Sequence, residues 1–174
     1  MTLSLQSTDF DIFGLAPQFA IDRAALGARW KDLQREAHPD RFATATPSAQ
    51  REAMQWSVRI NEAYQRLKDP LKRAAYLCER NGAPIRAEDN TAMPPAFLMQ
   101  QMQWREDLDD AQTMVDLERM AAEVATARRE MLEALQHTAD VLRDHAVLSQ
   151  QVRSLMFVER FARDVDARLD QLGQ

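Results

Sequence analysis

The chain has 174 residues, of which 45% are apolar and 28% are charged, so it has room for one domain or two small ones but not for a large enzyme. It contains no run of about 18 apolar residues that would span a membrane, and its first five residues lack the basic start of a secretory signal. The net charge of −5 divides into +2 for residues 1–80 and −7 for residues 81–174, and neither half has the clustered positive charge of a nucleic-acid-binding protein.

The chain is predicted to be helical almost throughout, because it has only four glycines and no long alternation of apolar and polar residues. A short first helix is expected over residues 10–15. Asp22 is a suitable N-cap for a second helix that runs to about Ala37, before Pro39 stops it. The predicted buried stripe of that second helix comprises Leu26, Trp30, Leu33 and Ala37.

In the first half of the chain, each of the next two helices is predicted to begin at a capping residue followed by a proline. Thr46-Pro47 begins a long helix, and Asp69-Pro70 begins a short one that ends near Gly82. Cys78 lies in this short helix and is the only cysteine, which excludes an internal disulfide or a multi-cysteine metal site. We expect a buried structural thiol in a reducing cytoplasm. The predicted stripe of the long helix comprises Ala53, Ile60, Ala63, Tyr64 and Leu67.

Residues 81–95 contain one glycine and three prolines and are predicted to link two domains, residues 1–80 and residues 96–174. This linker is either flexible or clamped by contacts between the domains. Three helical segments follow, at about 96–112, 114–137 and 140–172. Their short connections predict a compact three-helix bundle, so the expected fold class is all-α.

The triplet His38-Pro39-Asp40 stands where the second predicted helix ends. Pro39 fixes its own φ and removes a backbone donor, so the turn is expected to be stiff and to hold both flanking side chains outward. A carboxylate presented in this way suits a bidentate, charge-assisted bond to an arginine of a partner.

The surroundings of this triplet resemble a J-domain over about residues 9–80. The triplet lies in a loop between two amphipathic helices, and the second of these reads Ile60-Asn61-Glu62-Ala63-Tyr64 and then Leu67-Lys68-Asp69-Pro70. The resemblance implies an N-terminal helical hairpin whose loop docks on the ATP-bound state of a DnaK-type chaperone and accelerates ATP hydrolysis. Asp40 would engage a chaperone arginine, His38 and Pro39 would shape the contact, and Arg41 would complete the loop.

Three basic residues of the second predicted helix are further candidates for chaperone binding. Lys31 and Arg35 lie away from the buried stripe, and Arg29 flanks it. The alternative is an ordinary solvated face, because Asp32 and Glu36 lie there too.

The second half resembles the HscB family, the J-type co-chaperones of iron–sulfur cluster biogenesis. The resemblance rests on Ala96-Phe97-Leu98-Met99-Gln100-Gln101-Met102 and Trp104-Arg105-Glu106-Asp107-Leu108-Asp109, on Asp11-Ile12-Phe13-Gly14-Leu15, and on the length. A Gly/Phe-rich linker and a CxxCxGxG zinc region are absent. The resemblance implies two partners, the chaperone HscA and the scaffold IscU, and no cofactor. The missing N-terminal CxxC module indicates the bacterial type.

A second binding surface is predicted on the second domain, residues 96–174. Leu98, Met99 and Met102 point away from the seam of their helix, and Phe157 points away from the seam of the last helix. Exposed apolar patches mark interaction sites, and Glu106 falls at the rim of this one. The predicted seams are Phe97, Trp104, Leu108 and Ala111 in one helix and Leu148, Val152, Leu155, Val158, Ala162 and Leu169 in the other.

Alternatives to this scaffold-binding surface stay open. In the alternative interpretation, the same face packs on the J-domain or carries only scattered apolar side chains at the surface. Met156 and Phe161 also fall off the seam and have no assignment. Gln103 stands where many relatives have an acidic residue. A J-protein with a different client is the second hypothesis for the function.

An enzyme is the remaining rival. His38 and Asp40 would be its catalytic pair, but no nucleophile motif or phosphate-binding glycine loop accompanies them. The acidic run Glu106, Asp107, Asp109 and Asp110 lies along one helix and is interpreted as a solvated face rather than a metal site. We expect a monomer without catalysis of its own.

Overall fold

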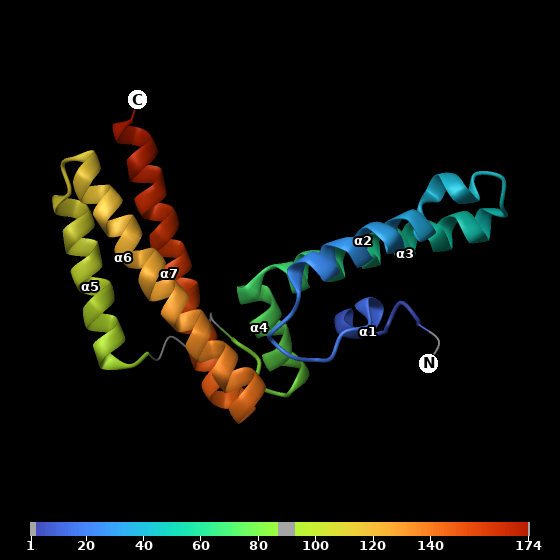
Figure 1. Ribbon diagram of the computed structural model, residues 1–174, viewed down its shortest axis with the longest axis horizontal. Helices are drawn as coiled ribbons and strands as arrows, with labels where there is room; N and C mark the ends of the chain where they lie inside the picture. Colours follow the sequence, from blue (N-terminus) through green and yellow to red (C-terminus); the bar gives the residue numbers. More distant parts are fainter. Residues whose placement is uncertain (1–2, 87–92, 174) are drawn as a thin grey trace. The chain divides into compact units, whose positions relative to one another are not determined.

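The computed structural model describes residues 3–86 and 93–173, and within these ranges every regular element is a helix (Figure 1). The predicted all-α fold class is therefore confirmed. Contacts divide the chain into two compact units, one up to Leu77 and one from Cys78 onward. The elements are α1 (Asp9–Phe13), α2 (Arg23–Ala37), the 3₁₀ turn η1 (Pro39–Phe42), α3 (Pro47–Lys68), α4 (Pro70–Arg80), α5 (Pro95–Asp110), α6 (Met114–Gln136), the π-helical turn η2 (His137–Leu142) and α7 (His145–Leu172).

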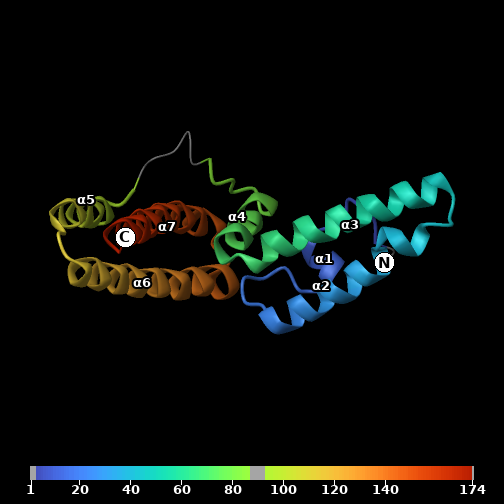
Figure 2. The same ribbon diagram turned by 90° about the horizontal axis from the view of Figure 1, so that it is seen from above.

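Helices α2 and α3 form a hairpin in the first unit, and both begin at the predicted caps (Figures 1 and 2). The Asp22 carboxylate accepts from the backbone N–H groups of Ala24 and Ala25, at 2.9 and 3.0 Å. The Thr46 hydroxyl accepts from the N–H of Ala49 at 3.3 Å. These bonds satisfy donors that the first turn of a helix leaves without an intrahelical partner.

Most residues of the two predicted stripes are buried in the first unit, with three exceptions. Trp30, Ala37 and Tyr64 are only partly buried. The Trp30 and Tyr64 rings stack on one another with centroids 4.7 Å apart. The stripe residues that are fully buried are Leu26, Leu33, Ala53, Ile60, Ala63 and Leu67.

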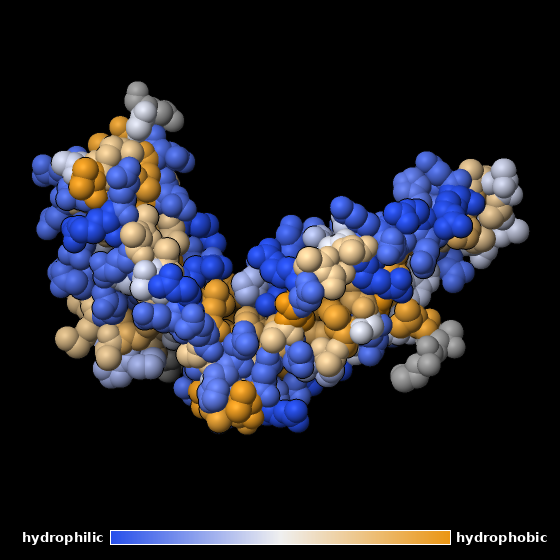
Figure 3. Space-filling view, viewed as in Figure 1, coloured by the Kyte–Doolittle hydropathy of each residue, from blue (hydrophilic) through white to orange (hydrophobic). Residues whose placement is uncertain are grey.

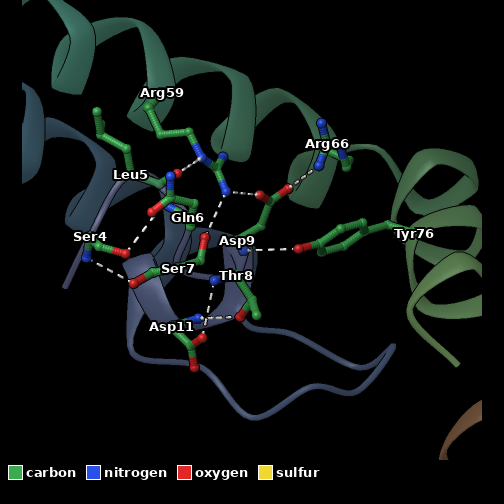
Figure 4. A network of polar contacts seen from close by, with 10 residues as sticks. All are labelled: Ser4, Leu5, Gln6, Ser7, Thr8, Asp9, Asp11, Arg59, Arg66 and Tyr76. Atoms are coloured by element: carbon green, nitrogen blue, oxygen red, sulfur yellow. Dashed lines mark hydrogen bonds and ion pairs between the residues drawn. The ribbon is translucent and has the colours of Figure 1, made fainter. Parts of the chain in front are cut away.

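Helix α1 is tied to α3 by the buried carboxylate of Asp9 and to α4 by the backbone N–H of the same residue (Figure 4). Asp9 has no exposed surface, and its two carboxylate oxygens lie 2.7 Å from Arg59 Nη2 and 3.1 Å from Arg66 Nη1. Its backbone N–H donates to the Tyr76 hydroxyl at 3.1 Å, and the Arg66 guanidinium lies over the Tyr76 ring. One residue of α1 therefore holds contacts to two other helices.

The second unit is the predicted three-helix bundle, with α5 and α7 running in the same direction and α6 in the opposite one (Figure 1). On α7, Phe161 is fully buried and stacks on Trp104 of α5, with ring centroids 5.3 Å apart. The helical periodicity of the sequence predicts that Phe161 lies outside the buried seam of α7. It is a core residue because α7 packs against both α5 and α6, so its buried face is wider than one seam.

Helices α6 and α7 are joined by the π-helical turn η2, where the sequence predicts only a short break between segments at about 114–137 and 140–172. No glycine or proline lies between Gln136 and Asp144 to end α6 at a turn. The chain instead widens to π geometry, and Arg143 takes a left-handed conformation with φ of 54°. Asp144 then caps α7 by accepting from the Val147 N–H at 3.0 Å.

Part of the predicted linker, residues 87–92, lies outside the described residues. On one side of it, Ile85 is buried and its carbonyl accepts from Arg153 Nη1 of α7 at 2.9 Å. On the other side, the Ser154 hydroxyl of α7 lies 3.9 Å from Met93 Sδ. Residues flanking the gap are thus held to α7, within the second unit.

The single cysteine is the buried thiol that the sequence predicts. Cys78 is completely buried, and this burial raises the pKa of its thiol from 9.0 to about 12. Because the thiolate is the reactive form, we expect no alkylation by iodoacetamide at pH 8 in the folded protein and complete alkylation in urea. The neutral thiol favours the folded state below pH 9, and this contribution is lost between pH 9 and about 12. Rapid alkylation of the folded protein, measured by mass spectrometry, would contradict this assignment.

Candidate functional site

The candidate docking turn begins directly after α2. His38 is extended, with φ −62° and ψ 128°, and the four residues that follow form the 3₁₀ turn η1. The Arg41 N–H donates to the His38 carbonyl at 3.0 Å, and the Ala43 N–H donates to the Asp40 carbonyl at 3.3 Å. Pro39 at the first position needs no hydrogen bond and has the φ that a helical turn requires. The sequence therefore folds locally into a compact turn.

The carboxylate of Asp40 points into solvent, with 91% of its side chain exposed. His38 Nδ1 accepts from the Asp40 N–H at 3.3 Å and lies 3.6 Å from the Asp40 carboxylate. The second distance is too long for a hydrogen bond, and a nitrogen that accepts a bond carries no proton to share. The imidazole thus orders the turn through the backbone and leaves the Asp40 carboxylate available to a partner.

A residue that the sequence did not single out closes the rest of the loop. Gln50 of α3 donates its side-chain amide to the carbonyls of Ala43 and Ala45, at 3.0 and 3.2 Å. These carbonyls lie outside the helices and would otherwise depend on water. No local pattern marks Gln50, because its partners are set by the path of the loop.

The three basic candidates on α2 do not share one face. Lys31 and Arg35 lie opposite the buried Leu26, whereas Arg29 lies roughly 120–160° around the helix from them. Arg35 pairs with Asp32 at 3.2 Å, and Lys31 has no ion pair among the described residues. The exposed basic face beside the turn therefore consists of Lys31 and Arg35.

The four apolar residues predicted to lie off the helix seams are exposed. Leu98, Met99 and Met102 on α5 have 47%, 70% and 64% of their surface exposed, and Phe157 on α7 has 45%. Glu106, two turns beyond Met99 on α5, is also exposed. Of the predicted α5 seam, Trp104 and Ala111 are buried, while Phe97 and Leu108 are half-buried.

Helices α5 and α7, which carry these apolar residues, contact each other through two side-chain pairs. Trp104 stacks on Phe161, and Arg105 Nη1 lies 3.0 Å from an Asp164 carboxylate oxygen. The two helices run in the same direction (Figure 1), and the partners in these two pairs are 57 and 59 residues apart in the sequence. Offsets of this size place Leu98 within about two residues, or about 3 Å along the helix axis, of the level of Phe157. We call Leu98, Met99, Met102 and Phe157, with Glu106 beside them on α5, the client surface, after the role that the sequence predicts for them.

Another exposed apolar group lies where α6 passes into α7, and the sequence analysis missed it. Val141, Leu142 and Val147 have 66%, 59% and 40% of their surface exposed. The tip of this unit is orange at the lower edge of Figure 3. The π-helical geometry of η2 determines which of its side chains point outward. A helical wheel drawn at 3.6 residues per turn therefore does not predict their exposure.

The described residues hold neither a metal-like cluster nor a membrane-spanning helix. Within residues 3–86 and 93–173, no three His, Cys, Asp or Glu side chains gather as metal ligands would. Glu106, Asp107, Asp109 and Asp110 lie along α5. No described helix combines the length and apolarity that a membrane crossing needs.

Comparison with protein families gives a match over residues 93–166 to the model described as "HSCB C-terminal oligomerisation domain". Curated relatives called "Co-chaperone protein HscB homolog" match nearly the whole chain. The protein from Bordetella petrii is 51% identical over 91% of this chain and 94% of its own length. The protein from Burkholderia multivorans is 49% identical over 98% of each chain.

Two solved structures have the same fold. The chaperone HscB from Vibrio cholerae has a TM-score of 0.84 and 34% identity, covering 95% of this chain and 99% of its own. The human co-chaperone protein HscB has a TM-score of 0.90 and 21% identity, covering 97% of this chain and 85% of its own.

Proposed function

This chain belongs to the HscB family of co-chaperones, and we propose that it couples a DnaK-type chaperone, HscA, to the iron–sulfur scaffold IscU. The family consists of co-chaperones rather than enzymes. In this proposal the turn at His38, Pro39 and Asp40 stimulates the ATPase of HscA, and the second unit delivers IscU in the cytoplasm. The observation that carries it is the Asp40 carboxylate, which is 91% exposed on an ordered turn.

The charges around the turn support docking on a partner with an arginine and acidic side chains. The Asp40 carboxylate suits a bidentate contact with a guanidinium. Lys31 and Arg35 add positive charge on the neighbouring face of α2, which would accelerate encounter with an acidic surface. Arg41 Nη1 lies 3.4 Å from the Arg35 carbonyl, so its charge is held near the same turn.

Binding of HscA to the immobilised chain tests this docking. We expect binding in ATP and little in ADP, and we expect Lys31→Glu to weaken it about threefold to tenfold by reversing a charge near the contact. Arg23→Glu is the matched control, because it makes the same charge change at the far end of α2. Equal weakening by both variants would indicate general charge attraction, and no binding in either nucleotide would refute the docking proposal.

The client surface on the second unit supports the delivery step. Its two methionines are adaptable in shape, and an exposed apolar cluster of this kind is stabilised when a partner covers it. Binding the client on one unit and the chaperone on the other raises their concentration near each other without any new contact. The matching family model is described as an oligomerisation domain, whereas the sequence predicts a monomer. The monomer stays a prediction, which sedimentation equilibrium checks.

Truncating the client surface should weaken scaffold binding. Leu98→Ala/Met102→Ala/Phe157→Ala removes apolar area worth about 1.5–3 kcal/mol for each fully buried side chain, so we expect affinity for IscU to fall by more than about tenfold. Stability should change little, because these side chains are exposed. Isothermal calorimetry and thermal melting measure the two effects.

A matched control is the triple variant Val115→Ala/Val141→Ala/Leu142→Ala, which removes exposed apolar side chains elsewhere on the same unit. It should bind IscU normally. Unchanged affinity in the client-surface variant would place the scaffold site elsewhere.

A further inference from the structure

A pocket of about 390 Å³ opens on the first unit beside the 3₁₀ turn η1. Its walls come from the end of α2, from η1, from α3 as far as Ile60, and from the N-terminal segment with α1. Large apolar side chains line it, namely Ile12, Leu33, Phe42, Trp56 and Ile60. The volume falls within the range of about 300–1,000 Å³ that small-molecule sites occupy.

The pocket exists because the hairpin is longer than the helix that covers it. Helix α1 has five residues and lies against the hairpin short of its loop end, in both views (Figures 1 and 2). Beyond α1, the facing positions of α2 and α3 are occupied by Ala37, Ala49 and Ala53. Side chains of this size cannot fill the space between two helices, so the apolar floor stays open.

Two carboxylates give the pocket a charge preference. Glu36 and Glu52 line it from α2 and α3, and no lysine, arginine or histidine is among its lining residues. Glu36 is 4.0 Å from Arg29, and Glu52 has no ion pair among the described residues. An apolar floor with negative charge beside it complements an apolar body that carries one positive charge.

We propose that this pocket binds a small amphipathic amine, with an aromatic or aliphatic body on the apolar floor and a protonated amino group near Glu36 and Glu52. The bound molecule contacts Ala37 and Phe42, which flank the docking turn on its two sides. Occupancy therefore changes the environment of the turn directly. The proposal does not depend on the proposed co-chaperone function, since binding is measured on the isolated chain.

Nuclear magnetic resonance titration of the full ¹⁵N-labelled chain tests the pocket with probes that share one ring system. Tryptamine is cationic at pH 7, indole is neutral and indole-3-acetate is anionic. We expect tryptamine to produce saturable shifts at Ala37, Phe42 and Ala53 and to bind at least about fivefold more tightly than indole-3-acetate. No saturable shift, or equal affinity for the two charged probes, would overturn the proposal.

Two variants locate the binding. Ala49→Leu places a larger side chain in the pocket and should weaken tryptamine binding at least about tenfold, whereas Ala28→Leu, on the exposed face of α2 outside the pocket, should not. Glu52→Gln keeps the shape and should remove most of the preference for tryptamine over indole. Because Glu52 is exposed, this variant keeps its fold even if Ala49→Leu does not. Undiminished charge preference in Glu52→Gln would also overturn the proposal.

Discussion

Asp40→Asn is expected to abolish stimulation of the HscA ATPase while changing the free energy of unfolding by less than about 0.5 kcal/mol. The amide has the shape of the carboxylate but lacks its charge, so a bidentate bond to an arginine is lost. Removing one partner of such a pair costs about 2–5 kcal/mol, or about 30-fold to several-thousand-fold in affinity. The fold should tolerate the change because the side chain is 91% exposed and bonds no other side chain of the core.

Phosphate release by HscA at increasing concentrations of the variant measures this loss, with thermal melting alongside. His38→Gln should reduce stimulation as well, because His38 Nδ1 accepts the Asp40 N–H that orders the turn. Glu62→Gln makes the same carboxylate-to-amide change on the exposed face of α3 and should stimulate normally. Normal stimulation by Asp40→Asn would exclude the carboxylate from the contact.

Asp9→Ala is expected to destabilise the first unit by about 3–5 kcal/mol, the usual effect of removing one partner from a buried ion pair. Arg59 would keep its bonds to the Leu5 and Ser7 carbonyls, at 3.1 and 2.9 Å, but would lose its charged partner. Arg66 would lose the one carboxylate with which it pairs among the described residues, and its side chain is more exposed to water than that of Arg59 (Figure 4). This loss is a large share of a domain's typical stability of about 5–15 kcal/mol.

Urea denaturation measures the change, and hydrogen exchange shows whether it is confined to residues 3–77. Asp164→Ala is the control, because it breaks the more exposed Arg105–Asp164 pair and should cost at most about 1 kcal/mol. Asp9→Asn should fall between these values, since its amide still accepts one bond. Equal small losses for Asp9→Ala and Asp164→Ala would show that the buried network contributes little to stability.

Features set by neighbouring residues were predictable from the sequence. Asp22 and Thr46 cap their helices within three residues, and Pro39 ends α2 through its own ring. Exposure of Leu98 and Phe157 followed from helical periodicity, because their helices are regular where those residues lie.

Features set by distant residues were not predictable in the same way. Asp9 and Arg59 are 50 positions apart in the sequence, and no local pattern predicts that they pair. Phe161 is buried because α5 also contacts α7 and covers the side of α7 on which Phe161 lies. A helical wheel drawn for one buried seam does not predict this second contact. Whether Asp40 and Leu98 bind the proposed partners stays a prediction until those partners are tested.

Steady-state phosphate release by HscA, with the full chain and with or without IscU, tests whether the chain couples the chaperone to the scaffold. We expect the chain alone to accelerate ATP turnover by HscA, and IscU to accelerate it further in the chain's presence. In Leu98→Ala/Met102→Ala/Phe157→Ala, the increment from IscU should disappear while stimulation by the chain itself persists. ATP turnover that does not respond to the wild-type chain, with or without IscU, would refute the proposed coupling of HscA to IscU.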